Sequence, residues 1–499
     1  MVHSGHARDV SMRMPLREES GAMFLDRTAE LAFLGSVLTR RHPGPGQFIM
    51  LYGRRRVGKS TLLQHWVEQS ELPFTYWVAE KEPALLQRRK FFAHLLRGDP
   101  TSPTTPTFDS WSALWGAAAT ILEGKRHILV IDELPYAAES DPAMLSALQH
   151  AWDQHFEQSQ VILVICGSQV RTMELLLSRQ SPIYGRLTGQ WPLRPLPFGA
   201  LRAFVPTWTP AEQVAAYAIV GGVPSYLRWL NPDRSLVDNI RHELLTPGSM
   251  ALSEVELLLA DEVREPRTYL AILQAIGGGY HTLDEIANAS LVGKSNLSAY
   301  LAQLDEFKLV ERRTPATIPP ALQYRSKRGR YHLRDAFFRF YFRFVYPHRA
   351  DVNYQPERVM PAIESNLRAF VGSTAWEELA RAWVERQHDT KVLGFLPQAV
   401  GSHWSRSVQI DVIAINWQTH DILLGECKWG AEAVDRSMIR ELVAKTPLVL
   451  ADLPDRGVDW HIHYAIFARA GATPAARQEL AGHHGVLVEL TRLYQELAI

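Results

Sequence analysis

The sequence contains few cysteines, no long apolar run and no excess of charge of either sign. Its 499 residues include two cysteines, Cys166 and Cys427, too few for a disulfide framework, so a reducing compartment such as the cytoplasm is expected. Apolar runs such as Phe48–Tyr52 are much shorter than the ~18 to 20 residues of a membrane span, so no transmembrane helix is expected. With 53 basic and 53 acidic residues, the net charge of +0 excludes a globally basic nucleic-acid-binding surface and leaves room only for a local patch.

Apolar strand-like runs alternate with amphipathic segments in the N-terminal part of the chain. Strands are predicted at Phe48–Tyr52, Phe74–Ala79, His127–Ile131 and Val161–Cys166. Helices are predicted between them, for example at Ala84–Leu96 and Ala143–Phe156. This order predicts an α/β fold with a parallel sheet covered on both faces. Beyond it, Leu201–Leu230 and Ser235–Ala260 have helical patterns, which predict a helical lid.

A glycine-rich loop, GRRRVGKST, connects the first predicted strand to a helix and matches the phosphate-binding pattern G-x-x-x-x-G-K-[ST] in full. The two glycines allow backbone N–H groups to turn onto a phosphate at the helix N-terminus. Lys59 is expected to neutralise the β and γ oxygens of ATP, and Ser60 to ligate Mg²⁺. The residues predicted to bind ATP through this loop are Gly53, Arg54, Arg55, Arg56, Val57, Gly58, Lys59, Ser60 and Thr61.

Polar side chains follow the third and fourth predicted strands, at the edge where a parallel sheet binds its ligand. Asp132 is expected to hold Mg²⁺ through water, and Glu133 to polarise the water that attacks the γ-phosphate. Ser168 and Gln169 end the following strand, where a polar side chain can sense the γ-phosphate. The alternative for the two acids is a solvated acidic turn.

Six short motifs stand in a characteristic order between Phe24 and Leu230: FLDRTAEL, GRRRVGKST, ILVIDELPY, ICGSQ, SPIYGRLTG and GGVPSYL. This set resembles the archaeal-type ATPases of the AAA+ and STAND-like P-loop group. The resemblance implies that Phe24–Leu31 lies against the adenine and that Gly222, Val223 and Pro224 contact the nucleotide from the lid. It also implies that Arg186 reaches a γ-phosphate; the alternative is a surface salt-bridge arginine. If Arg186 acts on a neighbouring subunit, a homo-oligomer is expected.

Residues 267 to 333 have the pattern of three helices followed by a hairpin, which predicts a winged helix-turn-helix with wing strands at Val310–Arg313 and Gly329–Leu333. Basic residues cluster on the predicted wing: Arg312, Arg313, Arg325, Lys327, Arg328 and Arg330. A basic wing beside a recognition helix beginning near Gly293 would grip the DNA backbone, so DNA is the expected partner. The alternative is a module that only packs between the domains on either side.

Near the C-terminus, acidic side chains interrupt two apolar strands, predicted at Val408–Asn416 and Ile422–Lys428 after a helix at Leu367–Arg386. If the turn between the strands is centred on Gln418 and Thr419, antiparallel pairing places Asp411 opposite Glu426 on one face. Two such carboxylates can ligate Mg²⁺, while Lys428 on the same face can orient or deprotonate a water that attacks a phosphodiester.

The set Asp411, Glu426 and Lys428 resembles the PD-(D/E)xK nuclease core over about Leu367 to Phe467. The resemblance implies an α/β domain of the restriction-endonuclease type, with Glu377 as a further carboxylate ligand. Two alternatives remain open: a structural salt bridge between Asp411 and Lys428, or a nuclease fold kept for binding without cutting.

These patterns divide the chain into a disordered leader (1–22), a P-loop ATPase core (23–198), a helical lid (199–265), a winged helix (266–335) and a nuclease-like domain (336–499). The leading hypothesis is a Mg²⁺-dependent ATPase whose nucleotide state controls a DNA-binding and DNA-cleaving C-terminal half. The second hypothesis is an ATP-gated regulatory or assembly switch that binds DNA or protein and cuts nothing.

Overall fold

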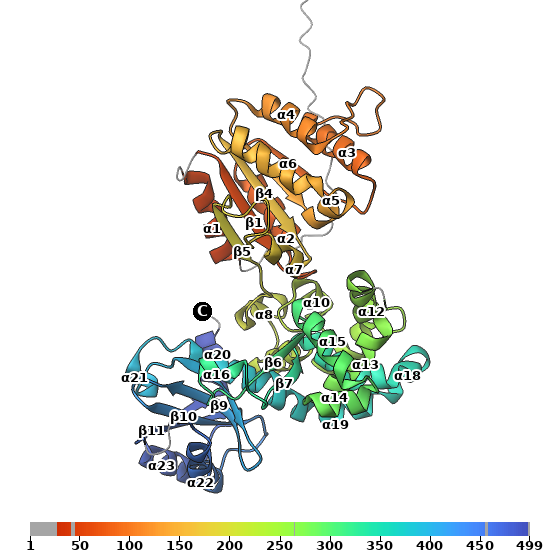
Figure 1. The fold of residues 1–499 in the computed structure, drawn as a ribbon. Helices are drawn as coiled ribbons and strands as arrows, with labels where there is room; N and C mark the ends of the chain where they lie inside the picture. Colours follow the sequence, from red (N-terminus) through yellow and green to blue (C-terminus); the bar gives the residue numbers. More distant parts are fainter. Residues whose placement is uncertain (1–26, 41–44, 264, 455–457, 498–499) are drawn as a thin grey trace, which may run out of the picture.

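The computed structural model describes residues 27–40, 45–263, 265–454 and 458–497, arranged in three lobes (Figure 1). The predicted leader and the first residues of the FLDRTAEL motif lie outside the described residues. The upper lobe holds a parallel sheet, the lower right lobe is mostly helical, and the lower left lobe holds a mixed sheet. Within the described residues, no helix is both long and apolar enough to cross a membrane.

The upper lobe is a five-stranded parallel sheet in the order β2-β3-β4-β1-β5. Its strands are β1 (Gln47–Tyr52), β2 (Phe74–Val78), β3 (His127–Asp132), β4 (Val161–Gly167) and β5 (Gly189–Pro192). The central strands β1, β3 and β4 are buried at every position, which explains their predominantly apolar sequences. The four predicted strands are confirmed to within one residue; β5 was not predicted, because its sequence, GQWP, is short and has no apolar run.

Helices cover both faces of this sheet and enclose two separate cores. They are α1 (Thr28–Thr39), α2 (Lys59–Gln69), α3 (Ala84–Leu96), α4 (Trp111–Leu122), α5 (Leu134–Ser140), α6 (Ala143–Ala151) and α7 (Val170–Leu175). The core against α1 and α2 lies on one face, and the core against α3, α4 and α6 on the other. Because all five strands are parallel, their carboxyl ends bring the glycine-rich loop, Asp132 and Ser168 to one edge.

The predicted lid is helical, but its two long helices are broken into short ones. They are α8 (Leu201–Phe204), α9 (Pro210–Val220), α10 (Pro224–Leu227), α11 (Leu236–Asn239), η3 (Ile240–Leu244) and α12 (Met250–Glu262). The sequence Gly221-Gly222-Val223-Pro224 ends α9, since Gly221 has a φ of 62° and Pro224 starts a new helix. Gly248, with a φ of 87°, separates η3 from α12 in the same way.

The next module has the predicted order of three helices and a hairpin. Its elements are α13 (Pro266–Gly277), α14 (Leu283–Ser290), α15 (Lys294–Glu306), β6 (Val310–Arg313) and β7 (Arg330–Leu333). The loop between the two strands, which includes α16 (Pro320–Gln323), packs on the lower left lobe. The Ala316 N–H donates to the Ser402 carbonyl at 2.9 Å, and Trp404 Nε1 donates to the Arg328 carbonyl at 2.9 Å.

The remaining residues form a mixed five-stranded sheet with flanking helices. The helices before it are α17 (Ala336–Phe340), α18 (Arg349–Tyr354), α19 (Met360–Val371), α20 (Glu377–Glu385) and α21 (Thr390–Leu393). The sheet is β8 (Ala399–Trp404), β9 (Gln409–Asn416), β10 (Asp421–Lys428), β11 (His461–Ala468) and β12 (Val486–Glu489), with α22 (Arg436–Ala451), α23 (Pro474–Gly482) and α24 (Leu490–Leu497). Strands β8, β9 and β10 are antiparallel, and α22 carries the chain across to β11, which is parallel to β10.

The two strands predicted in this region are confirmed to within one residue. The predicted helix at 367–386 is also confirmed, as part of a continuous helix that begins at Met360 and contains a π-helical turn, η7 (Gly372–Trp376), between α19 and α20. One hydrophobic core runs from Leu196 to Leu497 and joins the helical lid, the three-helix module and one face of the mixed sheet.

Candidate nucleotide site and C-terminal carboxylate site

The glycine-rich loop adopts the backbone geometry that phosphate binding requires. Gly58 has a φ of 89° and immediately precedes α2, a conformation that favours glycine. Lys59 is 5% exposed, and its ammonium donates to the carbonyl oxygen of Arg54 at 3.1 Å. That ammonium is therefore held over the loop, where a bound phosphate would compete for it.

Asp132 meets Ser60 at the edge of the sheet. The Ser60 hydroxyl donates to Asp132 Oδ2 at 2.6 Å, and the Tyr76 hydroxyl donates to the same oxygen at 2.7 Å. Burial, and then the charge of Asp132, raise the pKa of Tyr76, so its hydroxyl stays a donor. A serine hydroxyl and a carboxylate are oxygen donors of the kind Mg²⁺ prefers, so these residues fit the cation. Tyr76 was not predicted, because its strand has no motif that marks it.

Glu133 is fixed beside the predicted γ-phosphate sensor. Its backbone is left-handed, with a φ of 52°, a strained conformation for a side-chain-bearing residue. Glu133 Oε2 accepts hydrogen bonds from the Ser168 N–H at 3.0 Å and from the Ser168 hydroxyl at 2.9 Å. The structure thus brings Lys59, Ser60, Asp132, Glu133 and Ser168 together at one sheet edge.

The lid closes over the phosphate loop from the other side. Pro224 lies against Gly58, since a Cβ added there would be 3.8 Å from Pro224 Cγ. The Ser225 hydroxyl donates to the Arg56 carbonyl at 3.3 Å, and the Arg56 guanidinium pairs with the fully buried Glu254 of α12 at 2.7 Å. Between these elements lies a cavity of about 380 Å³, large enough for the phosphates of a nucleotide.

The two other loop arginines contact different parts of the chain. Arg55 donates to the Tyr136 hydroxyl of α5 at 2.6 Å. The Arg54 guanidinium pairs with Asp335, a buried carboxylate at the start of α17. Burial alone would lower the pKa of Arg54, but Asp335 outweighs it and the pKa is raised. Sequence reasoning missed Glu254 and Asp335, because neither lies near a recognisable motif.

Two residues implied by the sequence motifs have contacts of their own. Arg27, in the FLDRTAEL motif, donates to the carbonyl of Val57 at 2.7 Å and so joins this segment to the phosphate loop. Arg186 forms a bidentate ion pair with Asp153, at 2.7 and 2.8 Å, with 28% of its side chain exposed. The salt-bridge alternative for Arg186 is therefore present in the structure, and its role at a γ-phosphate remains a prediction.

The carboxylates of the mixed sheet have the predicted register. Val412 pairs with Gly425, so the position after Gly425 falls opposite Asp411 as the turn arithmetic requires. Asp411 Oδ2 accepts a hydrogen bond from the Cys427 N–H at 3.0 Å. Burial, and then the charge of Glu426, raise the pKa of Asp411, as expected for two carboxylates on one face.

Glu426 is held by two lysines. Its Oε1 accepts from Lys428 at 3.0 Å, and its Oε2 accepts from Lys445 of α22 at 2.9 Å. Burial would lower the pKa of Lys428, but Glu426 outweighs it and the pKa is raised, which favours an orienting role over deprotonation of water. Among the residues with described side chains, no three His, Cys, Asp or Glu groups lie close enough to hold a metal ion. The carboxylates fit Mg²⁺ held through one or two protein oxygens and water.

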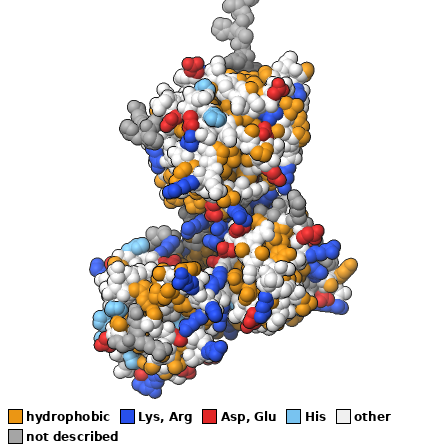
Figure 2. Space-filling model, in the orientation of Figure 1, with side chains coloured by type: hydrophobic (Ala, Val, Ile, Leu, Met, Phe, Trp, Pro, Cys, Tyr) orange, Lys and Arg blue, Asp and Glu red, His pale blue; other side chains and the backbone are white. Residues whose placement is uncertain are grey.

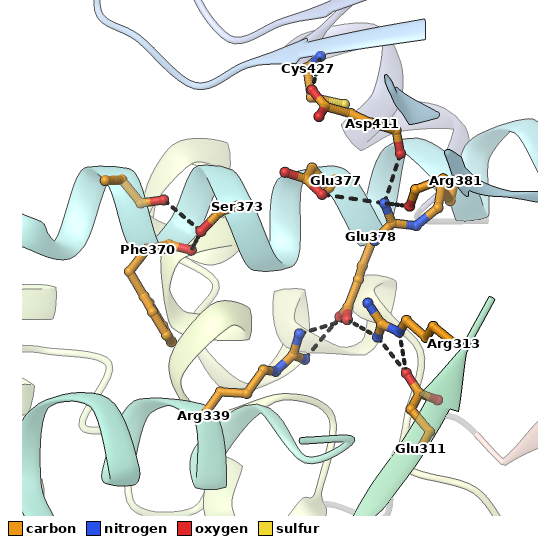
Figure 3. A network of polar contacts seen from close by, with 12 residues as sticks. Glu311, Arg313, Arg339, Phe370, Ser373, Glu377, Glu378, Arg381, Asp411 and Cys427 are labelled. Carbon is orange, nitrogen blue, oxygen red and sulfur yellow. Dashed lines mark hydrogen bonds and ion pairs between the residues drawn. The ribbon is translucent and has the colours of Figure 1, made fainter. Parts of the chain in front are cut away.

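Adjacent glutamates at the start of α20 face two different surroundings (Figure 3). Glu377 lies near Asp411, and burial, then Asp411, raise its pKa. Glu378 accepts from Arg339 at 2.6 and 2.9 Å and from Arg313 at 2.9 Å. Burial alone would raise the pKa of Glu378, but these arginines hold it at about 2.

Several wing residues predicted to contact DNA are engaged within the chain instead. Arg313 pairs with Glu311 and Glu378, and Arg328 lies 3.5 Å from Asp452. Lys and Arg side chains nevertheless gather on the face seen in Figure 2, around the junction of the three lobes. The packing alternative for this module is thus partly realised.

Comparison with known proteins shows the family of this chain. Residues 24–230 match the model of an ATPase domain found predominantly in Archaea, and residues 341–439 match a model described as archaeal and bacterial proteins of unknown function. A Methanocaldococcus jannaschii protein, "Uncharacterized protein MJECL04", is 32% identical over 453 residues, 90% of this chain and 96% of the relative. The chain belongs to the archaeal ATPase family. This archaeal-type ATPase therefore combines a nucleotide-binding P-loop domain with a C-terminal mixed-sheet domain.

The similarity to solved structures is weaker. The Walker-type ATPase PABY2304 of Pyrococcus abyssi has a TM-score of 0.47 and 18% identity, covering 64% of this ATPase and 95% of that chain. The ORC2 protein of Aeropyrum pernix, in ADPNP–ADP complexes, has a TM-score of 0.44 and 16% identity, covering 71% of this ATPase and 97% of that chain.

Proposed function

We propose that this protein is a Mg²⁺-dependent ATPase whose nucleotide state controls a DNA-binding and DNA-cleaving C-terminal half. One observation carries the proposal: a continuous series of contacts runs from the phosphate loop to the carboxylate site. Each half also has the chemistry that its role requires.

In the ATPase half, Lys59 would bind the β and γ oxygens, and Ser60 and Asp132 would hold Mg²⁺. Glu133 would polarise the attacking water, with Ser168 fixing its carboxylate. When bound, Mg²⁺ would neutralise charge on the phosphates. The contact of Pro224 with Gly58 supports the expected contact of Pro224 with the nucleotide from the lid.

In the C-terminal half, Asp411 and Glu426 would hold Mg²⁺ together with water, and Lys428 would orient a water. Because no three acidic groups of the described residues lie close enough to share an ion, Glu377, the further ligand expected from the sequence, would act only through water. When bound, Mg²⁺ would stabilise the charge that develops on the phosphate. In the hydrolysis, the water oxygen bonds to phosphorus, one P–O ester bond breaks, and the departing oxygen takes a proton. The mixed sheet with its crossover helix α22 supports a nuclease-type domain, and the three helices and hairpin before it support a winged helix.

The connecting contacts begin at Lys59, whose ammonium donates to the Arg54 carbonyl. A phosphate that binds Lys59 would remove this hydrogen bond and free the Arg54 backbone. The Arg54 side chain holds Asp335, which caps α17 by accepting from the Phe338 N–H at 2.9 Å. One turn further along the chain, Arg339 holds Glu378, whose neighbour Glu377 faces the carboxylate site. A change at the phosphate loop can therefore reach α20 through α17.

Asp335→Asn is expected to leave ATP hydrolysis within about threefold of the parent but to remove the effect of ATP on DNA binding, because it weakens the link between Arg54 and α17. Allosteric coupling typically changes affinity by about 5- to 150-fold. In this variant, the ratio of the DNA affinities with ATP and with ADP should fall close to one. Fluorescence anisotropy of labelled DNA, with ADP and with a non-hydrolysable ATP analogue, measures it.

Two further variants make this test decisive. Arg339→Gln interrupts the same series of contacts but leaves Arg54 paired with Asp335. It therefore tests the route even if Asp335→Asn misfolds because its buried Arg54 has lost its partner. Arg171→Ala removes a more exposed ion pair with Glu306 between the same lobes and should keep the coupling. Parental coupling in both Asp335→Asn and Arg339→Gln would refute the proposed route.

Arg186→Ala is expected to lower ATP hydrolysis, whereas Asp153→Ala, which removes the same surface ion pair, should not. The ion pair alone is worth about 0 to 1 kcal/mol of stability, so both variants should fold. If Arg186 acts on a neighbouring subunit, mixing Arg186→Ala with Lys59→Ala chains should restore activity. Equal ATP hydrolysis by parent and both variants would leave Arg186 with a structural role only.

The second candidate function, an ATP-gated switch that binds DNA or protein without cutting, is favoured by one observation. Both oxygens of Glu426 are occupied by lysines, Lys428 and Lys445, which is also how a site that binds no metal would balance its charge. Incubation with plasmid DNA, with and without ATP and Mg²⁺ or Mn²⁺, separates the two functions.

A further inference from the structure

A cleft of about 550 Å³ separates the three-helix module from the mixed sheet. Glu377 and Asp411 lie on the mixed-sheet side, and β7 and α13 contribute the opposite wall. The carboxylates of the proposed nuclease site therefore open between two modules and not onto a flat surface. Any phosphodiester that reaches Asp411 from this side must pass the residues of that opposite wall.

Cations without carboxylate partners line this cleft. Arg313 and Arg339 are neutralised by Glu378, whereas neither Arg330 nor Arg343 has an ion-pair partner among the described residues. Arg330 is held in place by Trp404, because its guanidinium lies over the indole ring at 5.1 Å from the centroid. Arg330, held by Trp404, and the exposed Arg343 line the same cleft as Glu377 and Asp411, so an anion bound by these cations would lie in the cleft of the proposed catalytic carboxylates.

Aromatic side chains complete the lining. Phe344, Phe370 and Trp404 contribute to the walls but are only 4 to 9% exposed, and Arg330 lies over the Trp404 ring, so the rings anchor the wall and the cations face the cleft. Proteins that bind single-stranded nucleic acid follow its backbone with such a positively charged groove. A cleft of about 550 Å³ is the size of a site for one drug-sized ligand, so it admits a nucleotide or two of one strand and not paired DNA.

We propose that this cleft binds a single nucleic-acid strand, with backbone phosphates on Arg330 and Arg343. The inference rests on the proposed nuclease function and specifies its substrate as a strand, a flap or an unpaired end. The cleft directs one phosphodiester toward Asp411 and Glu377, while paired DNA stays outside.

The test compares full-length protein on three labelled DNA probes: a single strand, the matching blunt duplex, and that duplex with a single-stranded tail. Anisotropy in EDTA measures binding without cleavage, and Mg²⁺ is then added to measure cutting. The parent should bind the strand and the tailed duplex at least ~10-fold more tightly than the blunt duplex. Arg330→Ala combined with Arg343→Ala should remove this preference. It should also lower the slope of log affinity against log salt concentration by about one unit per lost phosphate contact.

Two controls separate a specific role from a general loss of charge. Arg325→Ala combined with Lys327→Ala removes two exposed charges from the same wing loop outside the cleft and should keep the preference. Arg343→Ala alone changes an exposed residue, so it should fold and still weaken strand binding.

The outcomes distinguish this inference from the function on which it rests. If the protein cuts the blunt duplex, and if this cutting depends on Asp411 but not on Arg330 or Arg343, the strand proposal is overturned and the proposed nuclease function stands. Strand binding that needs both arginines, without cutting in Mg²⁺ or Mn²⁺, would support the cleft and refute the nuclease. Equal binding of all three probes by parent and variants would overturn the strand proposal.

Discussion

Replacing Glu133 with glutamine is expected to leave ATP binding intact and to lower turnover by on the order of 100- to 10,000-fold, the usual contribution of a general base. Glutamine keeps an acceptor oxygen for the Ser168 N–H and hydroxyl, so the loop should stay in place. Only the charge that polarises the attacking water is lost. Steady-state phosphate release measures turnover, and equilibrium binding of a fluorescent ATP analogue measures affinity.

Lysine variants provide the comparison for this experiment. Lys59→Ala should lose roughly 10- to 150-fold in ATP affinity, because hydrogen bonds to charged groups contribute about 1.5 to 3 kcal/mol and no other described lysine lines the phosphate cavity. Lys125→Ala, an exposed change in the same domain, should bind and hydrolyse ATP like the parent. Parental turnover by Glu133→Gln would mean that another group activates the water.

Asp411→Ala is expected to eliminate metal-dependent DNA cleavage, by roughly 100-fold or more, while ATP hydrolysis stays at the parental rate. Asp411 is the carboxylate that lies both opposite Glu426 and in the cleft, so no neighbour can replace it. The ATPase carboxylates belong to a separate sheet, which is why the two activities should separate. Gel analysis of plasmid and strand substrates, beside a phosphate-release assay, tests this.

A surface glutamate of the same domain is the matched control. Glu432→Ala changes an exposed side chain shortly after β10 and should cut DNA like the parent. Cleavage that persists equally in Asp411→Ala and parent protein would show that the nuclease is a contaminant, since the carboxylate essential to the proposal is then dispensable.

Local patterns predicted the parts of this molecule that depend on neighbouring residues. The phosphate loop was predictable because its glycines, lysine and serine act within one turn. The pairing of Asp411 with Glu426 followed from strand alternation and a short turn, which together fix the register.

Contacts between distant segments could not be predicted in this way. Asp335 meets Arg54 across 281 residues of sequence, and Lys445 meets Glu426 from the crossover helix α22, and no spacing in the sequence marks either one. The π-helical turn η7 was also not predicted, because the helix stays continuous through it and no residue type in the sequence marks it.

The single core that runs from Leu196 to Leu497 limits how this protein can have diversified. Gene fusion and recombination usually exchange pieces that carry their own interiors. A crossover near residue 266 or 336 would pass through a shared interior and leave apolar side chains on both products without their neighbours. The lower half is therefore expected to be inherited as one block, with the parallel-sheet domain as the exchangeable unit.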